Sequence, residues 1–207
     1  MKTAAEAKLS ASDLAVKIAD RILATTTYEF KNTKTGKTYK SVKNLPLDMN
    51  VKVACKYNNW HYTNGVTHIA LMELADKMGA KKYDDYVLKN MNFVFNEGNL
   101  DFFKKQYEQA MKNEGWYGVR KLSWHMIFRG KRLDDNGPMG ASLIDLQMKH
   151  PNNSFLNYIN ETAEHLNYGE PRLADGTIAR IWPHENTIWA DDAFMAISFL
   201  ARMAKMT

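Results

Sequence analysis

The feature that most constrains the fold is a helical spacing of apolar residues that recurs along nearly the whole chain. Apolar side chains three and four positions apart share one face of a helix, and the sequence shows neither an alternation of strands with helices nor a strict repeat. Successive helices of this kind pack as antiparallel hairpins. The pattern therefore predicts an all-α fold of about seven helices, at roughly Ser12–Ala24, Asn64–Gly79, Lys81–Gly98, Leu100–Lys112, Pro138–Lys149, Phe155–Leu166 and Asp191–Lys205.

Two segments interrupt the helical spacing. Tyr28–Val42, with the sequence YEFKNTKTGKTYKSV, has alternating aromatic residues around a Lys-Thr-Gly-Lys centre, which predicts a hairpin or extended loop. Asn167–Glu185, with the sequence NYGEPRLADGTIARIWPHE, contains Gly, Pro and an Asp-Gly pair, which favour a loop with a short hairpin.

Length and composition describe an ordinary globular chain. Its 207 residues, 45% of them hydrophobic, suit a single domain spanning 1–207 with a substantial core. The net charge of +5 is small, and no nucleic-acid-binding motif accompanies the lysines, so we expect no nucleic-acid partner. No stretch is long and apolar enough to cross a membrane. The single cysteine, Cys55, excludes an intrachain disulfide and any site built on several cysteines.

The first 25 residues carry charges throughout an amphipathic pattern, which distinguishes them from a secretory signal. We therefore expect a cytoplasmic protein, or a periplasmic one whose signal peptide is not present in this chain.

Three of the expected helices follow unusual polar and aromatic segments, whereas a helix such as Phe155–Leu166 begins after ordinary Asn and Ser caps. In a ring of helical hairpins, inner and outer helices alternate, and the inner helices begin at one end of the ring. The three segments would then meet in one pocket; they are NNWHYTNGV (Asn58–Val66), KRLDDNGPMG (Lys131–Gly140) and NTIWADDAFM (Asn186–Met195).

These segments also carry a family resemblance. WHYTNGV, LDDNGPMG and DGTIAR…TIWADDAFM, in this order, resemble glycoside hydrolase family 105, the unsaturated rhamnogalacturonyl hydrolases, which are related to the unsaturated glucuronyl hydrolases of family 88. The resemblance implies an (α/α)6 toroid of twelve helices, of which this chain would supply an incomplete, N-terminal part, with an insertion around Asn99–Lys121. Inner helices left exposed would favour self-association or binding of the missing half.

The resemblance further implies a reaction. Such enzymes remove a 4,5-unsaturated uronic acid from an oligosaccharide by hydrating its double bond: a carboxylic acid protonates C4, water adds at C5, and the resulting hemiketal opens and releases the neighbouring sugar. The substrate implied is an unsaturated galacturonyl residue of rhamnogalacturonan. No metal and no organic cofactor is needed.

Asp191, in its Trp-x-Asp context, resembles the general acid/base of the family. A helix N-terminus lowers the pKa of a carboxyl group, whereas an apolar neighbour or a second carboxylate raises it. Asp192, one step along the helix, is expected to cap it. The second carboxylate that would raise the pKa of Asp191 is expected in the segment Leu-Asp-Asp. The Leu-Asp match to the family favours Asp134, whereas the spacing to Gly140 favours Asp135. Of the two we prefer Asp135.

The resemblance and the sequence context suggest further residues that contact substrate. Core packing, helix capping and surface exposure are the ordinary alternatives for each of them. Gly65 and Gly140 are expected to permit close helix packing, and His61 and His68 lack companions for a zinc site. The candidate substrate-binding residues are Tyr62, Trp189, His184, Arg180, Asp134 and Met195.

Two alternatives stay open. A non-catalytic helical scaffold explains the helices but not the three polar segments. Another (α/α)6 sugar enzyme, such as an unsaturated glucuronyl hydrolase, explains both; an epimerase would need a histidine set that the sequence lacks.

Overall fold

The computed structural model describes residues 9–129, 133–181 and 183–207. This part of the chain is mostly helical, so the prediction of an all-α fold of toroid-type helical hairpins is confirmed. A π-helical turn, η1 (His165–Gly169), extends the seventh helix. The α-helices are α1 (Ala11–Thr25), α2 (Tyr62–Met78), α3 (Lys82–Val94), α4 (Glu97–Val119), α5 (Met126–Arg129), α6 (Leu133–Lys149), α7 (Asn153–Glu164) and α8 (Ala190–Met206).

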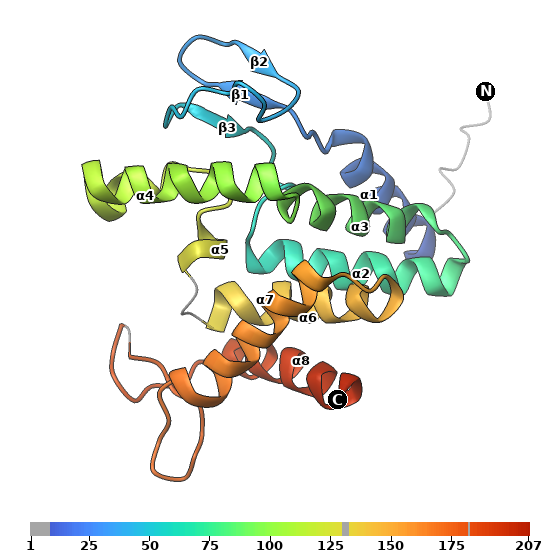
Figure 1. Cartoon of the computed structure of the whole chain (residues 1–207). Helices are drawn as coiled ribbons and strands as arrows, with labels where there is room; N and C mark the ends of the chain where they lie inside the picture. Colours follow the sequence, from blue (N-terminus) through green and yellow to red (C-terminus); the bar gives the residue numbers. More distant parts are fainter. Residues whose placement is uncertain (1–8, 130–132, 182) are drawn as a thin grey trace, which may run out of the picture.

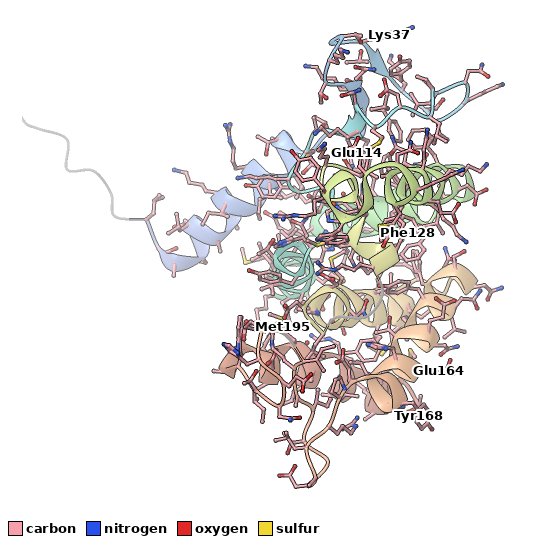
Figure 2. The ribbon with its side chains drawn as sticks, turned by 90° about the vertical axis from the view of Figure 1, so that its left-hand side faces the viewer. Lys37, Glu114, Phe128, Glu164, Tyr168 and Met195 are labelled. Carbon is pink, nitrogen blue, oxygen red and sulfur yellow. The ribbon has the colours of Figure 1, made fainter. Side chains whose placement is uncertain are left out.

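A small antiparallel sheet lies at one end of the molecule (Figure 1). Its strands β1 (Phe30–Asn32) and β2 (Thr38–Tyr39) form the predicted hairpin, and β3 (Val51–Val53) pairs with the other edge of β1. Lys37 lies in the turn of this hairpin, at the opposite end of the molecule from α8 (Figure 2). The lysines of this hairpin, Lys31, Lys34 and Lys37, are therefore remote from the start of α8 (Figure 2).

Three helices form the centre of the arrangement that positions the candidate site. α6 packs between α2 and α8, and most of its side chains are buried (Figure 1). Glycines permit this close approach. A Cβ atom on Gly65 of α2 would lie 2.5 Å from the backbone nitrogen of Met139, and one on Gly140 would lie 2.8 Å from the ring of Phe199. The packing role expected for both glycines is confirmed.

The three central helices run in the same direction. At their first turns, Gly65 of α2 meets the backbone of α6, and a Cβ on Gly137 of α6 would lie 2.7 Å from the carbonyl carbon of Met195 in α8. At their far ends, Lys149 of α6 pairs with Asp76 of α2 at 2.9 Å, and Arg202 of α8 pairs with Asp145 of α6 at 2.7 Å. The starts of α2, α6 and α8 therefore lie at one end of the bundle.

The helices α3 and α7 lie between the three central helices in the chain and lead it back to the end at which those helices begin. α3 packs on α2 and α7 packs on α6, as expected for helical hairpins. Lys149 also binds Asp84 in the first turn of α3, which shows that α3 begins near the end of α2. Tyr158 of α7 donates a hydrogen bond to the Asn136 side chain of α6 at 3.0 Å. The hairpin α2–α3 and the hairpin α6–α7 thus place the starts of α2 and α6 side by side, and α8 adds its start next to that of α6.

Local sequence explains several helix ends. α2 ends at Gly79, as predicted, because Gly79 adopts a left-handed conformation with φ 62° that glycine tolerates. Gly115, with φ 57°, bends α4, which spans the expected insertion. The start predicted for the helix Pro138–Lys149 was wrong: this helix, α6, begins at Leu133, five residues before Pro138. Pro138 cannot donate a main-chain hydrogen bond, yet the flanking contacts with α2 and α8 keep the segment helical.

No helix among the described residues combines the length and the hydropathy needed to cross a membrane.

Candidate active site

The start of α2 is joined to the start of α6 by Trp60. Its ring is fully buried against Tyr158, with ring centroids 4.9 Å apart, and its Nε1 donates a hydrogen bond to the main-chain carbonyl of Asp135 at 2.8 Å. His61 caps α2 by accepting from the Thr63 N–H. Tyr62 follows in the first turn and is 39% exposed. Trp60 is therefore a packing residue, whereas the Tyr62 ring is open to solvent.

The two aspartates of α6 point to different neighbours, since successive helix residues face different directions. Asp135 is 2% exposed, and its carboxylate pairs with the Arg129 guanidinium at the end of α5. Asp134 is partly exposed and accepts a hydrogen bond from Nη2 of Arg180 at 2.8 Å. Asp134 thus faces the loop before α8, and Asp135 faces the interior.

Arg180 joins the starts of α6 and α8. Its Nε lies 2.7 Å from Asp192 Oδ2 and its Nη2 lies 2.5 Å from Asp192 Oδ1, while Nη2 also reaches Asp134. The guanidinium lies over the Trp189 ring, 4.2 Å from its centroid. We call these four side chains, Arg180, Asp134, Asp192 and Trp189, the Arg180 cluster.

Asp192 also caps α8, as the sequence predicted. Its Oδ2 accepts from the main-chain N–H of Trp189 at 2.8 Å. Burial favours a higher pKa for this carboxyl group, but the hydrogen bonds from Arg180 and Trp189 outweigh it, and the pKa of Asp192 lies below its usual value. Asp192 is therefore a buried carboxylate that holds a negative charge.

A cavity of about 250 Å³ opens beside this cluster, between the start of α6, the π turn and the loop before α8. His165 and Glu170 form its far wall, with Nε2 of His165 3.1 Å from Oε1 of Glu170. Burial raises the pKa of Glu170, and the nearby Asp192 adds to this effect, although His165 and Arg180 oppose it. The acidic, basic and histidine residues of the wall are Asp134, His165, Glu170, Arg180 and Asp192.

The remaining candidates lie around the start of α8. Asp191 is exposed in its first turn. Trp189 is 43% exposed, and Met195 is buried one turn into α8, against α6. Met195 is marked on α8 in Figure 2. His184 is exposed in the preceding loop, where its carbonyl accepts from the Thr187 hydroxyl.

The comparisons with known proteins identify the family. The model of Glycosyl Hydrolase Family 88 matches residues 34–207. The chain belongs to glycosyl hydrolase family 88. No curated protein matches it significantly.

Membership of family 88 makes the chain a glycoside hydrolase with a carbohydrate substrate. The match covers all three polar helix starts and the loop that carries Arg180. The finer resemblance to family 105 remains a prediction. A non-catalytic scaffold does not explain the match to a glycoside hydrolase family.

Two residues of this family 88 chain were missed by the sequence interpretation, His165 and Glu170. The expected helix ended near Leu166, and nothing in the sequence marked the π turn that carries Glu170 to the cavity. π turns are rare in proteins overall, but those that occur are often at functional sites. Because the sequence does not signal such a turn, only the structure brings His165 and Glu170 together at the cavity.

The described residues contain no group of three or more His, Cys, Asp or Glu side chains placed to hold a metal ion. The carboxyl groups at the helix starts can accept, donate or position protons.

Proposed function

We propose that this family 88 chain removes a 4,5-unsaturated uronyl residue from an oligosaccharide by acid/base-catalysed hydration of the double bond. The single observation that carries the proposal is the exposed carboxyl group of Asp191 in the first turn of α8, the helix whose start packs against the start of α6. A carboxyl group at such a junction is accessible to substrate, while its helix is held by buried contacts.

Asp191 would be the general acid and base. It would protonate C4 of the unsaturated ring, and the carboxylate so formed would take a proton from the water that adds at C5. The C5 hemiketal would then open and the glycosidic bond would break. Proton uptake and release balance, so the reaction consumes only water.

The neighbouring residues would orient the sugar. Trp189 and Tyr62 offer exposed aromatic surfaces on which a sugar ring can stack. His184 would contact the uronate carboxylate, and Asp134 would accept a sugar hydroxyl. Asp135 would contribute negative charge from within α6, balanced by Arg129, and Met195 would support the floor of the site.

We propose an unsaturated galacturonyl residue of rhamnogalacturonan as the substrate, because the three helix-start motifs resemble family 105. The family 88 match favours an unsaturated glucuronyl residue as the second candidate. We also propose that the chain self-associates through the apolar side chains left exposed on α2 and α8.

The direct test follows the ultraviolet absorbance of the unsaturated ring. The parent chain, Asp191→Asn and the control Asp101→Asn, which alters an exposed carboxylate on α4, are each given an unsaturated galacturonyl-rhamnose disaccharide and an unsaturated glucuronyl disaccharide. We expect the absorbance to decay with the parent and the control, and to decay about 10²- to 10⁴-fold more slowly with Asp191→Asn.

The disaccharide whose absorbance decays faster with the parent chain identifies the preferred uronyl residue. Activity of Asp191→Asn equal to that of the parent would refute the role of Asp191. Unchanged absorbance of both disaccharides with the parent chain would refute the proposed reaction for this chain.

A further inference from the structure

Arg180 contacts two residues at the start of α8, Asp192 and Trp189. Its fork is occupied by the Asp192 carboxylate, with Nε and Nη2 at 2.7 and 2.5 Å, and Nη2 also holds Asp134 of α6. The guanidinium is partly buried and covers the Trp189 ring. One side chain therefore holds Trp189 before Asp191 and Asp192 after it, and ties both to α6 through Asp134.

These contacts bear on two alternative roles for Arg180: binding the substrate carboxylate, and orienting the neighbouring side chains. A substrate carboxylate could bind the Nε–Nη2 edge of Arg180 only by displacing Asp192, which would then be left as a buried negative charge without its partner. The same contacts suit a residue that orients its neighbours, because a planar guanidinium fixes both the direction and the distance of the groups that it binds.

We propose that Arg180 is a positioning residue that holds Trp189 and the first turn of α8 in the arrangement from which Asp191 acts. This inference rests on the proposed function. It assigns Arg180 to catalysis through its neighbours, and not to binding of the uronate carboxylate.

The chain contains a matched control for this role. Arg202 lies near the other end of α8 and pairs with Asp145 of α6 at 2.7 Å, with both side chains partly buried. It therefore also joins α6 to α8, but far from Asp191. Arg→Lys at either position keeps the positive charge and removes the planar fork.

The experiment compares Arg180→Lys and Arg202→Lys with the parent in kcat, KM and unfolding midpoint. For Arg180→Lys we expect kcat to fall about 10- to 100-fold, because small misplacements of a reacting group have effects of this size. We expect KM to rise by a smaller factor than kcat falls, since Arg180 affects substrate binding only through Trp189. Arg202→Lys should lower the unfolding midpoint to a similar extent and leave kcat close to that of the parent.

A rise in KM with unchanged kcat would overturn the inference in favour of direct substrate binding. Equal kcat values for the two variants would overturn it in favour of a structural role alone.

A second readout does not depend on activity. The indole N–H resonance of Trp189, assigned by comparison with Trp189→Phe, should shift in Arg180→Lys and stay in place in Arg202→Lys, because the guanidinium lies over this ring. An unshifted resonance in Arg180→Lys would refute the positioning of Trp189. A parent chain that hydrates no unsaturated uronide would refute the proposed function, and the resonance would still decide whether Arg180 positions Trp189.

Discussion

His68 is a buried histidine in α2 and sets a limit on stability in acid. Among the described residues neither of its ring nitrogens finds a hydrogen-bond partner, and its ring lies near that of Tyr86. Burial lowers the pKa of His68 to about 4, from an ordinary value of 6.5. The folded state therefore binds a proton less readily than the unfolded state does.

The first prediction concerns this residue. Because the pKa of His68 is lower in the folded state, its stabilising contribution is fully present above pH 6.5 and is lost as the pH falls from 6.5 towards 4. Between pH 7 and 4.5, the unfolding free energy of the parent should fall by about 2 kcal/mol more than that of His68→Leu. Urea unfolding of both proteins at the two pH values measures the difference; equal losses would contradict the assignment.

At the same scale, the sequence predicted a helix cap better than the contacts between helices. A helix cap is a local feature of the sequence, so the capping role of Asp192 was predicted correctly. The partners of Arg180 were not predicted, because Asp134 and Arg180 are 46 residues apart and only the packing of α6 against α8 brings them together.

At the scale of elements, the glycines of α2 and α6 set how closely the central helices approach. The backbone of α6 lies against Gly65, and that of α8 lies against Gly137, leaving no room for a side chain. Residues larger than glycine at these two positions would therefore push the backbones of the central helices apart.

The second prediction follows from this contact. Gly65→Ala should lower the unfolding free energy by about 1–3 kcal/mol, because the added methyl group would force the α6 backbone away. Gly98→Ala, in the first turn of α4, is the control, since its Cβ would meet mainly the Val42 side chain at 3.2 Å. Denaturant unfolding compares the two; equal stability of Gly65→Ala and the parent would contradict the close packing.

The helices were predictable because their apolar residues recur with helical spacing. Most ends were found within a few residues. The start of α6 was wrong because Leu133–Gly137 is held helical by the packing of α6 against α2 and α8, which the sequence pattern does not show. β3, with three residues, and α5, with four, were not predicted, because such short elements depend on their neighbours more than on their own sequence.

At the scale of the whole molecule, apolar side chains remain exposed on the helices that flank α6. Tyr62 and Val66 are exposed on α2, and Phe194 and Ile197 are exposed on α8. Exposed apolar residues on an ordered helix favour association. The exposed apolar side chains of α2 and α8 therefore form the surface proposed for self-association.

The third prediction tests this surface. Ile197→Glu should shift the chain towards the monomer, because a carboxylate in a buried apolar contact is costly. Met111→Glu, at an exposed apolar position on α4, should leave association unchanged. Sedimentation velocity over a range of concentrations measures both. A parent chain that stays monomeric, or equal association of the parent and Ile197→Glu, would contradict the proposal.

The measurement that tests the central claim most directly is the fate of the double bond. The parent chain is incubated in D2O with an unsaturated uronyl disaccharide, and the product is examined by NMR. Hydration begins with proton transfer to C4, so we predict a product that carries deuterium at C4 and has no C4–C5 double bond. Release of the second sugar from a uronate whose double bond is intact would show displacement at the anomeric carbon and contradict the account.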